Sequence, residues 1–197
     1  MTASRIGALV QGSLADGSRM VQMFTGSRSV LATITALALL ALLAAVVVRR
    51  RRILTALTGL SLAVVLGVTL VPTGGWRWFA VEPGALRSIM VNLRPAEADL
   101  TAWLTAADGP ANVVLFVPLG FFLALLLRAP VRAAVLAVGL SVLVECYQAS
   151  LTTRVGSFAD VVANGLGAVV GVVAAALVLA LTRPLLRPRR LTGPRVA

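Results

Sequence analysis

Long apolar runs alternate with short polar segments along most of this chain. A helix needs about 18 or more apolar residues to cross a bilayer, and five runs approach or exceed that length. Each can therefore cross a membrane once. The pattern predicts an all-α protein, a polytopic transmembrane helical bundle of about five spans, at Ser29 to Val48, Ile53 to Val71, Ala111 to Leu127, Val131 to Ala149 and Asp160 to Thr182.

Composition agrees with a lipid environment and excludes several classes of site. The chain is 59% hydrophobic and 13% charged, which is more apolar than a soluble domain. Its single cysteine, Cys146, cannot form an internal disulfide, and it has no histidine. With so few carboxylates, we expect no metal site and no cofactor.

Arginine placement explains the net charge of +11. The arginines flank the apolar runs and are not interleaved with stacking aromatics, so we expect membrane lipids as partners and no nucleic acid. In a five-span protein three groups share one side, which the positive-inside rule assigns to the cytoplasm. These groups are Arg49 to Arg52, Arg128 with Arg132, and Arg183, Arg187, Arg189, Arg190 and Arg195.

The same rule predicts an outer N-terminus and a cytoplasmic C-terminus. Arg5, Arg19 and Arg28 disagree, because they would lie outside. The chain then divides into an N-terminal segment that is disordered, interfacial or mis-assigned, two scaffold helices, an outer loop, a three-helix core and a basic cytoplasmic tail. The corresponding ranges are 1–28, 29–71, 72–110, 111–182 and 183–197.

The outer loop and the first two spans carry anchoring and packing patterns. Trp76, Trp78, Phe79 and Trp103 suit the headgroup level, and the spacing of Leu100, Trp103, Leu104 and Ala107 predicts a short interfacial helix. Gly59, Ala63 and Gly67 recur at every fourth position, which favours close packing of the first two spans.

Polar residues inside the last two spans are the candidates for function. Ser141, Glu145 and Gln148 share one helical face, and an ionisable residue there costs about 2.5 to 3.5 kcal/mol on insertion scales. Asp160, Asn164, Gly167 and Gly171 form a stripe on the next span, so two polar residues continue into a small-residue seam.

These polar groups are expected to converge near the outer surface. Glu145 and Asn164 would form a deeper layer than Gln148 and Asp160. Asn112 begins the third span on the same outer side, and Arg154 can reach a carboxylate from the loop. Glu145 and Asp160 are candidate catalytic or ligand-binding acids. Their alternative role is interhelical hydrogen bonding that fixes the order of the helices. Pro118 and Gly120 predict a kink or packing site in the third span.

Three linked motifs resemble the VanZ-like membrane protein family. They are Asn112 to Gly120, Glu145-Cys-Tyr-Gln148, and Arg154 followed by Asp160-Val-Val-Ala-Asn164-Gly-Leu-Gly167, and the resemblance covers roughly residues 109–181. It implies a protein of the bacterial cytoplasmic membrane and cell envelope with a link to teicoplanin resistance. Many relatives carry a second acidic residue where this chain has Ser157.

Three functions remain open from the sequence. The first is binding of a lipid-linked cell-wall precursor or a glycopeptide headgroup by Asn112, Glu145, Gln148, Arg154, Asp160 and Asn164. The second is a membrane-embedded enzyme for a polyisoprenyl-linked or phospholipid substrate, with Glu145 as acid or base, Asp160 tuning it and Arg154 holding an anion. The third is a small lipid transporter, suggested by Pro118 and the paired polar faces.

Overall fold

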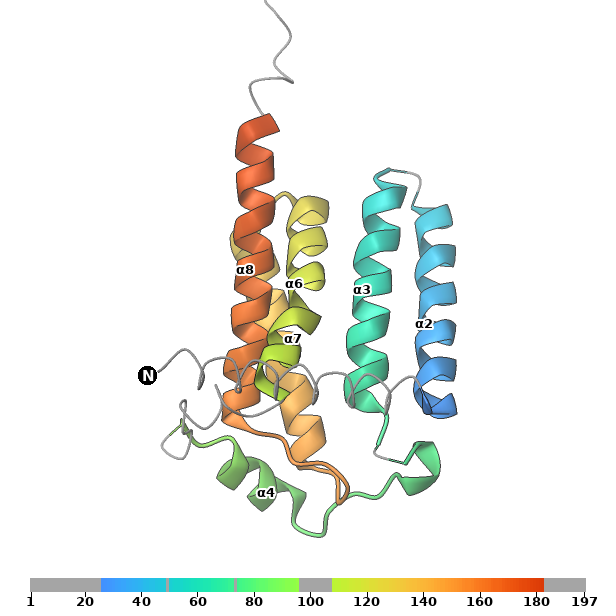
Figure 1. Cartoon of the computed structure of the whole chain (residues 1–197), viewed down its shortest axis with the longest axis vertical. Coiled ribbons are helices and arrows are strands. Elements are labelled where there is room, and N and C mark those ends of the chain that lie inside the picture. The colour runs from blue at the N-terminus through green and yellow to red at the C-terminus, as the bar shows by residue number, and fades with distance from the viewer. Residues whose placement is uncertain (1–25, 49, 73, 96–107, 183–197) are drawn as a thin grey trace, which may run out of the picture.

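Five long helices form the body of the protein, and they confirm the expected all-helical, membrane-spanning fold. The computed structural model describes residues 26–48, 50–72, 74–95 and 108–182. All five helices are long and apolar enough to cross a membrane. They are α2 (Arg28–Val47), α3 (Arg52–Leu70), α6 (Asp108–Leu127), α7 (Pro130–Ala149) and α8 (Phe158–Thr182), and they run alternately up and down in Figure 1.

Helices α2 and α3 pack through the small residues of α3. A Cβ atom added at Gly59 would lie 2.5 Å from the Cβ of Ala41, and one added at Gly67 would lie 2.2 Å from Ile34. Such distances are possible only when one helix offers no side chain. This pair stands beside the other three helices in Figure 1.

Helices α6 and α8 pack even more closely, backbone against backbone. An added Cβ at Gly167 would lie 2.0 Å from the carbonyl oxygen of Val113, and one at Gly171 would lie 2.1 Å from that of Val117. Gly120 has the reciprocal position on α6, 2.2 Å from the carbonyl of Ala168. The predicted packing glycines therefore hold α6 against α8. Pro118 differs, because its side chain is exposed and α6 continues through it.

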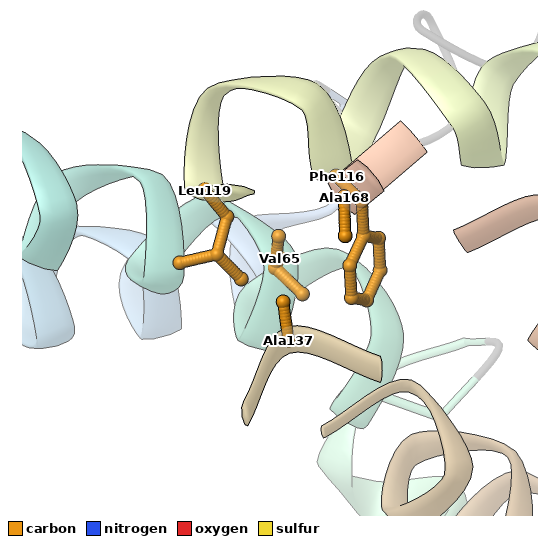
Figure 2. Close-up of a cluster of buried hydrophobic side chains, with 5 residues drawn as sticks. All are labelled: Val65, Phe116, Leu119, Ala137 and Ala168. Carbon is orange, nitrogen blue, oxygen red and sulfur yellow. The ribbon is translucent and has the colours of Figure 1, made fainter. Parts of the chain in front are cut away.

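A small apolar cluster joins α3 to the last three helices. Val65 of α3 is completely buried and points among Phe116, Leu119, Ala137 and Ala168, which come from α6, α7 and α8 (Figure 2). Many other large apolar side chains of the five helices are exposed, as expected for surfaces that face lipid.

One end of the bundle carries the longer connections (Figure 1). The 3-10 turn η1 (Trp76–Trp78) and the short helix α4 (Ala85–Asn92) lie there, and Val81 forms an antiparallel bridge with Leu151. The sequence did not predict α4. The interfacial helix expected around Leu100 to Ala107 lies outside the described residues, as do most of the N-terminal segment and the basic tail.

Candidate functional site

Glu145 of α7 is enclosed where α7 meets the beginning of α8. Its side chain is only 2% exposed, so both carboxylate oxygens need partners within the protein. Oε1 accepts a hydrogen bond from Nδ2 of Asn164 at 3.2 Å, and Oε2 accepts one from the backbone N–H of Ser157 at 3.1 Å. Glu145 thus connects the interior of α8 to the residue that precedes it.

Ser157 and Asp160 form the N-terminal cap of α8. The hydroxyl oxygen of Ser157 accepts a hydrogen bond from the backbone N–H of Asp160 at 3.0 Å, and the same hydroxyl donates to Oδ2 of Asp160 at 2.7 Å. Oδ1 of Asp160 accepts from Nδ2 of Asn112 on α6, also at 2.7 Å. A carboxylate in the first turn is favoured by the helix dipole. Three helices meet at this cap.

These five residues, Asn112, Glu145, Ser157, Asp160 and Asn164, are called the polar cluster below. It has an enclosed part and a more open part: Glu145 and Asn164 are buried, whereas the other three are half-buried. Ser157 links the two carboxylates, one through its N–H and one through its hydroxyl. The side-chain oxygen of Asn164 is buried and has no hydrogen-bond partner among the described residues. The cluster therefore has an unused acceptor.

A glycine allows the α7–α8 loop, residues 150–157, to close over Glu145. A Cβ added at Gly156 would lie 2.1 Å from the carbonyl oxygen of Glu145 and 2.8 Å from the backbone nitrogen of Ala149. The loop is also paired with residues 80–82, because Glu82 N–H donates to the carbonyl of Ser150 and Thr152 N–H donates to that of Ala80. The cluster thus lies beneath two joined loops.

Gln148 and Arg154 take part in a second, separate arrangement at the end of α3. The last carbonyls of a helix lack partners within it. Here four successive carbonyls, of residues 68 to 71, accept hydrogen bonds from side chains of α7 and the loop after it. Arg154 donates to the carbonyls of Val68 and Val71 at 3.0 and 2.9 Å. Gln148 donates to that of Thr69 at 3.2 Å, and the Tyr147 hydroxyl donates to that of Leu70 at 2.8 Å. The sequence did not predict this cap.

The charge of Arg154 suits its position at the carbonyl end of α3, where the helix dipole is negative. Burial lowers the pKa of the guanidinium below its ordinary value, and the nearby Glu145 and Tyr147 oppose that shift. An arginine remains protonated at neutral pH even so. Arg154 therefore supplies a positive charge between α3 and the acids of the polar cluster.

The structure brings together most, but not all, of the residues singled out from the sequence. Glu145 and Asn164 form the expected deeper pair. Gln148 makes no hydrogen bond to Asp160: Gln148 donates to α3, whereas Asp160 bonds Asn112 and Ser157. Sequence reasoning missed the cap role of Ser157, although Ser157-x-x-Asp160 is a capping-box pattern. It also missed Tyr147, which no local pattern marks.

The polar cluster combines carboxylate, amide and hydroxyl groups joined by hydrogen bonds. Among the described residues, no three His, Cys, Asp or Glu side chains gather closely enough to hold a metal ion. Glu145 and Asp160 present carboxylates, and Asn112 and Asn164 present amides. Chemically, such a set can bind groups that bring N–H or O–H donors.

Comparison with known proteins identifies one family. The family model described as VanZ/LLP1 matches residues 37–179, well over half of the chain. The match begins within α2, so it also covers the second part of α2 and all of α3, which carried none of the three motifs. No curated protein and no solved structure gives a significant match.

Proposed function

This chain belongs to the VanZ/LLP1 family, and from that premise we propose that it is a binding protein of the bacterial cell envelope. Its polar cluster would hold the headgroup of a lipid-linked cell-wall precursor or of a glycopeptide such as teicoplanin. The cluster would face outward from the cytoplasmic membrane, with the arginine-rich loops on the cytoplasmic side.

The unused side-chain oxygen of Asn164 is the observation that carries this proposal. Asn164 is 1% exposed, and its amide nitrogen is already committed to Glu145. A buried acceptor without a partner costs free energy unless a water or ligand supplies a donor. Peptide amides, ammonium groups and sugar hydroxyls all supply donors, and they are abundant in cell-wall precursors and in glycopeptides.

The difference in burial within the cluster indicates the order in which its residues would contact a headgroup. Asn112, Ser157 and Asp160 are half-buried and would meet the ligand first. Glu145 lies behind them and would act through Ser157, whose N–H it accepts, while the side-chain oxygen of Asn164 would take the ligand donor that reaches furthest into the cluster. Gln148 and Arg154 would contribute by holding α3 in place, because their polar atoms already bond its carbonyls.

Enclosure of Glu145 favours binding over catalysis. A general acid or base must come within hydrogen-bond reach of the proton that it transfers. Both oxygens of Glu145 accept bonds from the protein and the side chain is 2% exposed. We therefore place the enzyme hypothesis second.

The test compares cells that express the wild type, Glu145→Gln or Asp160→Asn at equal membrane abundance. Glu82→Gln is the matched control, because Glu82 is an exposed carboxylate at the same end but outside the cluster. We expect the wild type and the control to reduce teicoplanin susceptibility and the two cluster variants to lose that effect. Equal protection by all four proteins would contradict a binding role for the cluster.

Binding is then measured directly on the purified full-length protein. Teicoplanin and a polyisoprenyl-linked peptidoglycan precursor are titrated separately, so that a drug site and a precursor site are distinguished. We expect Asp160→Asn to weaken binding of the true ligand by about tenfold, since one charge-assisted hydrogen bond is lost. Release of a chemically altered product would instead support the enzyme hypothesis.

A further inference from the structure

The end of the bundle opposite the polar cluster carries only positive charges among the described residues. It consists of the α2–α3 loop and the α6–α7 loop, which lie together at the upper end in Figure 1. The described acidic residues, Glu82, Asp108, Glu145 and Asp160, all belong to the other end. We call the upper end the basic end, and its exposed arginines are Arg50, Arg51, Arg52, Arg128 and Arg132.

The two loops of the basic end are held against each other. The guanidinium of Arg51 donates a hydrogen bond to the carbonyl of Leu126 in the last turn of α6. Arg51 and Arg128 both have left-handed backbone conformations, with φ of 58° and 50°, which are uncommon for residues other than glycine. Such tight turns keep the arginines next to the helix ends, so that their positive charges lie close to one another.

The helices that begin here increase the positive potential. Neither α3 nor α7 has a side-chain cap at its N-terminus, so their first backbone N–H groups point toward this end without a side-chain partner. These N–H groups supplement the arginines and do not replace them. Guanidinium groups match phosphate oxygens well, because their planar N–H donors bind two oxygens at once.

Apolar side chains beside the arginines decide which source of phosphate fits. Ile53 follows Arg52 and is 71% exposed, and Val131 precedes Arg132 and is 77% exposed. A soluble phosphate has no acyl chains to contact these side chains. A phospholipid would cover them with its acyl chains while its phosphate meets the arginines.

We propose that the basic end binds the phosphate of an anionic phospholipid between the α2–α3 and α6–α7 loops. The lipid remains bound as a defined ligand, beyond the general attraction of arginines to a charged membrane. This site is independent of the polar cluster, since the two occupy opposite ends of the helices (Figure 1).

The experiment titrates purified full-length protein in detergent with phosphatidylglycerol or phosphatidylcholine and counts bound lipids by native mass spectrometry. We expect phosphatidylglycerol to form a one-to-one complex about tenfold more readily than phosphatidylcholine, because several guanidinium groups meet a lipid with net charge. Equal binding of the two lipids would overturn the proposal. Competition by millimolar inorganic phosphate would assign the site to a soluble anion and overturn it as well.

Two double variants locate the site. Arg52→Gln/Arg128→Gln removes two charges at the basic end, and Arg87→Gln/Arg94→Gln removes two exposed charges at the opposite end. We expect the first to weaken phosphatidylglycerol binding by about tenfold and the second to leave it unchanged. An equal loss in both would mean that only overall charge matters, which contradicts a defined site.

Salt dependence of the wild type provides a measurement that needs no variant. Binding of phosphatidylglycerol should weaken between low and high sodium chloride, because exposed charges are screened by salt. Binding that does not change with salt would overturn an arginine–phosphate site.

Discussion

The backbone N–H of Ser157 lies 3.1 Å from Oε2 of Glu145. This contact places the first residue outside α8 directly on a buried carboxylate of α7. In an ordinary capping box, the acidic residue three positions after the cap accepts the N–H of the cap residue. Here Glu145 takes that N–H, and Asp160 instead accepts from the Ser157 hydroxyl and from Asn112. Helix capping and the binding cluster are therefore built from the same atoms.

Replacement of Ser157 tests this dual use. Ser157→Ala removes the hydroxyl but keeps the N–H that meets Glu145, so we expect the protein to lose about 1 kcal/mol of stability as an N-cap is lost. Ser157→Thr keeps a hydroxyl and should stay close to the wild type. Thermal unfolding in detergent measures both, and equal stability of Ser157→Ala and wild type would contradict the cap.

The α6–α8 contact predicts a strong effect of a single methyl group. Gly171→Ala places a Cβ atom 2.1 Å from the carbonyl of Val117, so the helices must separate, at a cost of about 1 to 3 kcal/mol. Gly139→Ala is the control, because an added Cβ there has nothing within 4 Å. The control should be neutral or gain up to about 1 kcal/mol from helix propensity. Chemical denaturation in mixed micelles distinguishes the two, and equal effects would contradict the close approach.

The side-chain hydrogen bonds to the carbonyls of α3 predict that two variants lose stability to different extents. Tyr147→Phe removes one hydrogen bond, to Leu70, and should cost about 0.5 to 1.5 kcal/mol. Arg154→Gln removes the charge and the guanidinium that serves two carbonyls, so we expect a larger loss. Unfolding measurements on both variants check the order. A more severe effect of Tyr147→Phe than of Arg154→Gln would contradict the larger share that we assign to the guanidinium.

Labelling of single cysteines tests the orientation in the membrane. In a Cys146→Ala background, Met90→Cys places a thiol on exposed α4, and Arg50→Cys places one in the α2–α3 loop. A reagent that cannot cross the membrane should label Met90→Cys in intact cells and label Arg50→Cys only after lysis. The reverse pattern would invert the proposed topology.

The long helices could be predicted from the sequence because lipid requires an apolar run of fixed length. The residues at which the helices begin were predicted less accurately. Helix α6 begins at Asp108, three residues earlier than predicted, since Pro110 is tolerated in a first turn, and α8 begins at Phe158 because Ser157 caps it. The Glu145–Asn164 pair followed from helical spacing and depth.

The cap on α3 could not be predicted in the same way. It depends on where the end of one helix meets another, and its acceptors are carbonyl groups that leave no trace in a sequence. Gln148 and Arg154 were recognised from the sequence as candidate polar residues. Nothing in the sequence indicated that their partners are main-chain atoms some 80 residues away. Helix α4 was missed because eight residues give too little periodicity to recognise.

The use of main-chain acceptors means that these hydrogen bonds do not depend on which side chains the end of α3 carries. Tyr147, Gln148 and Arg154 bind atoms that every amino acid supplies, so substitutions at the half-buried Val68 or Leu70 leave these hydrogen bonds available provided that the backbone path of α3 is unchanged. Selection would then act on the donors in the second half of the chain and far less on the acceptors in the first. A motif confined to one half of the chain can thus fix the position of a helix in the other half.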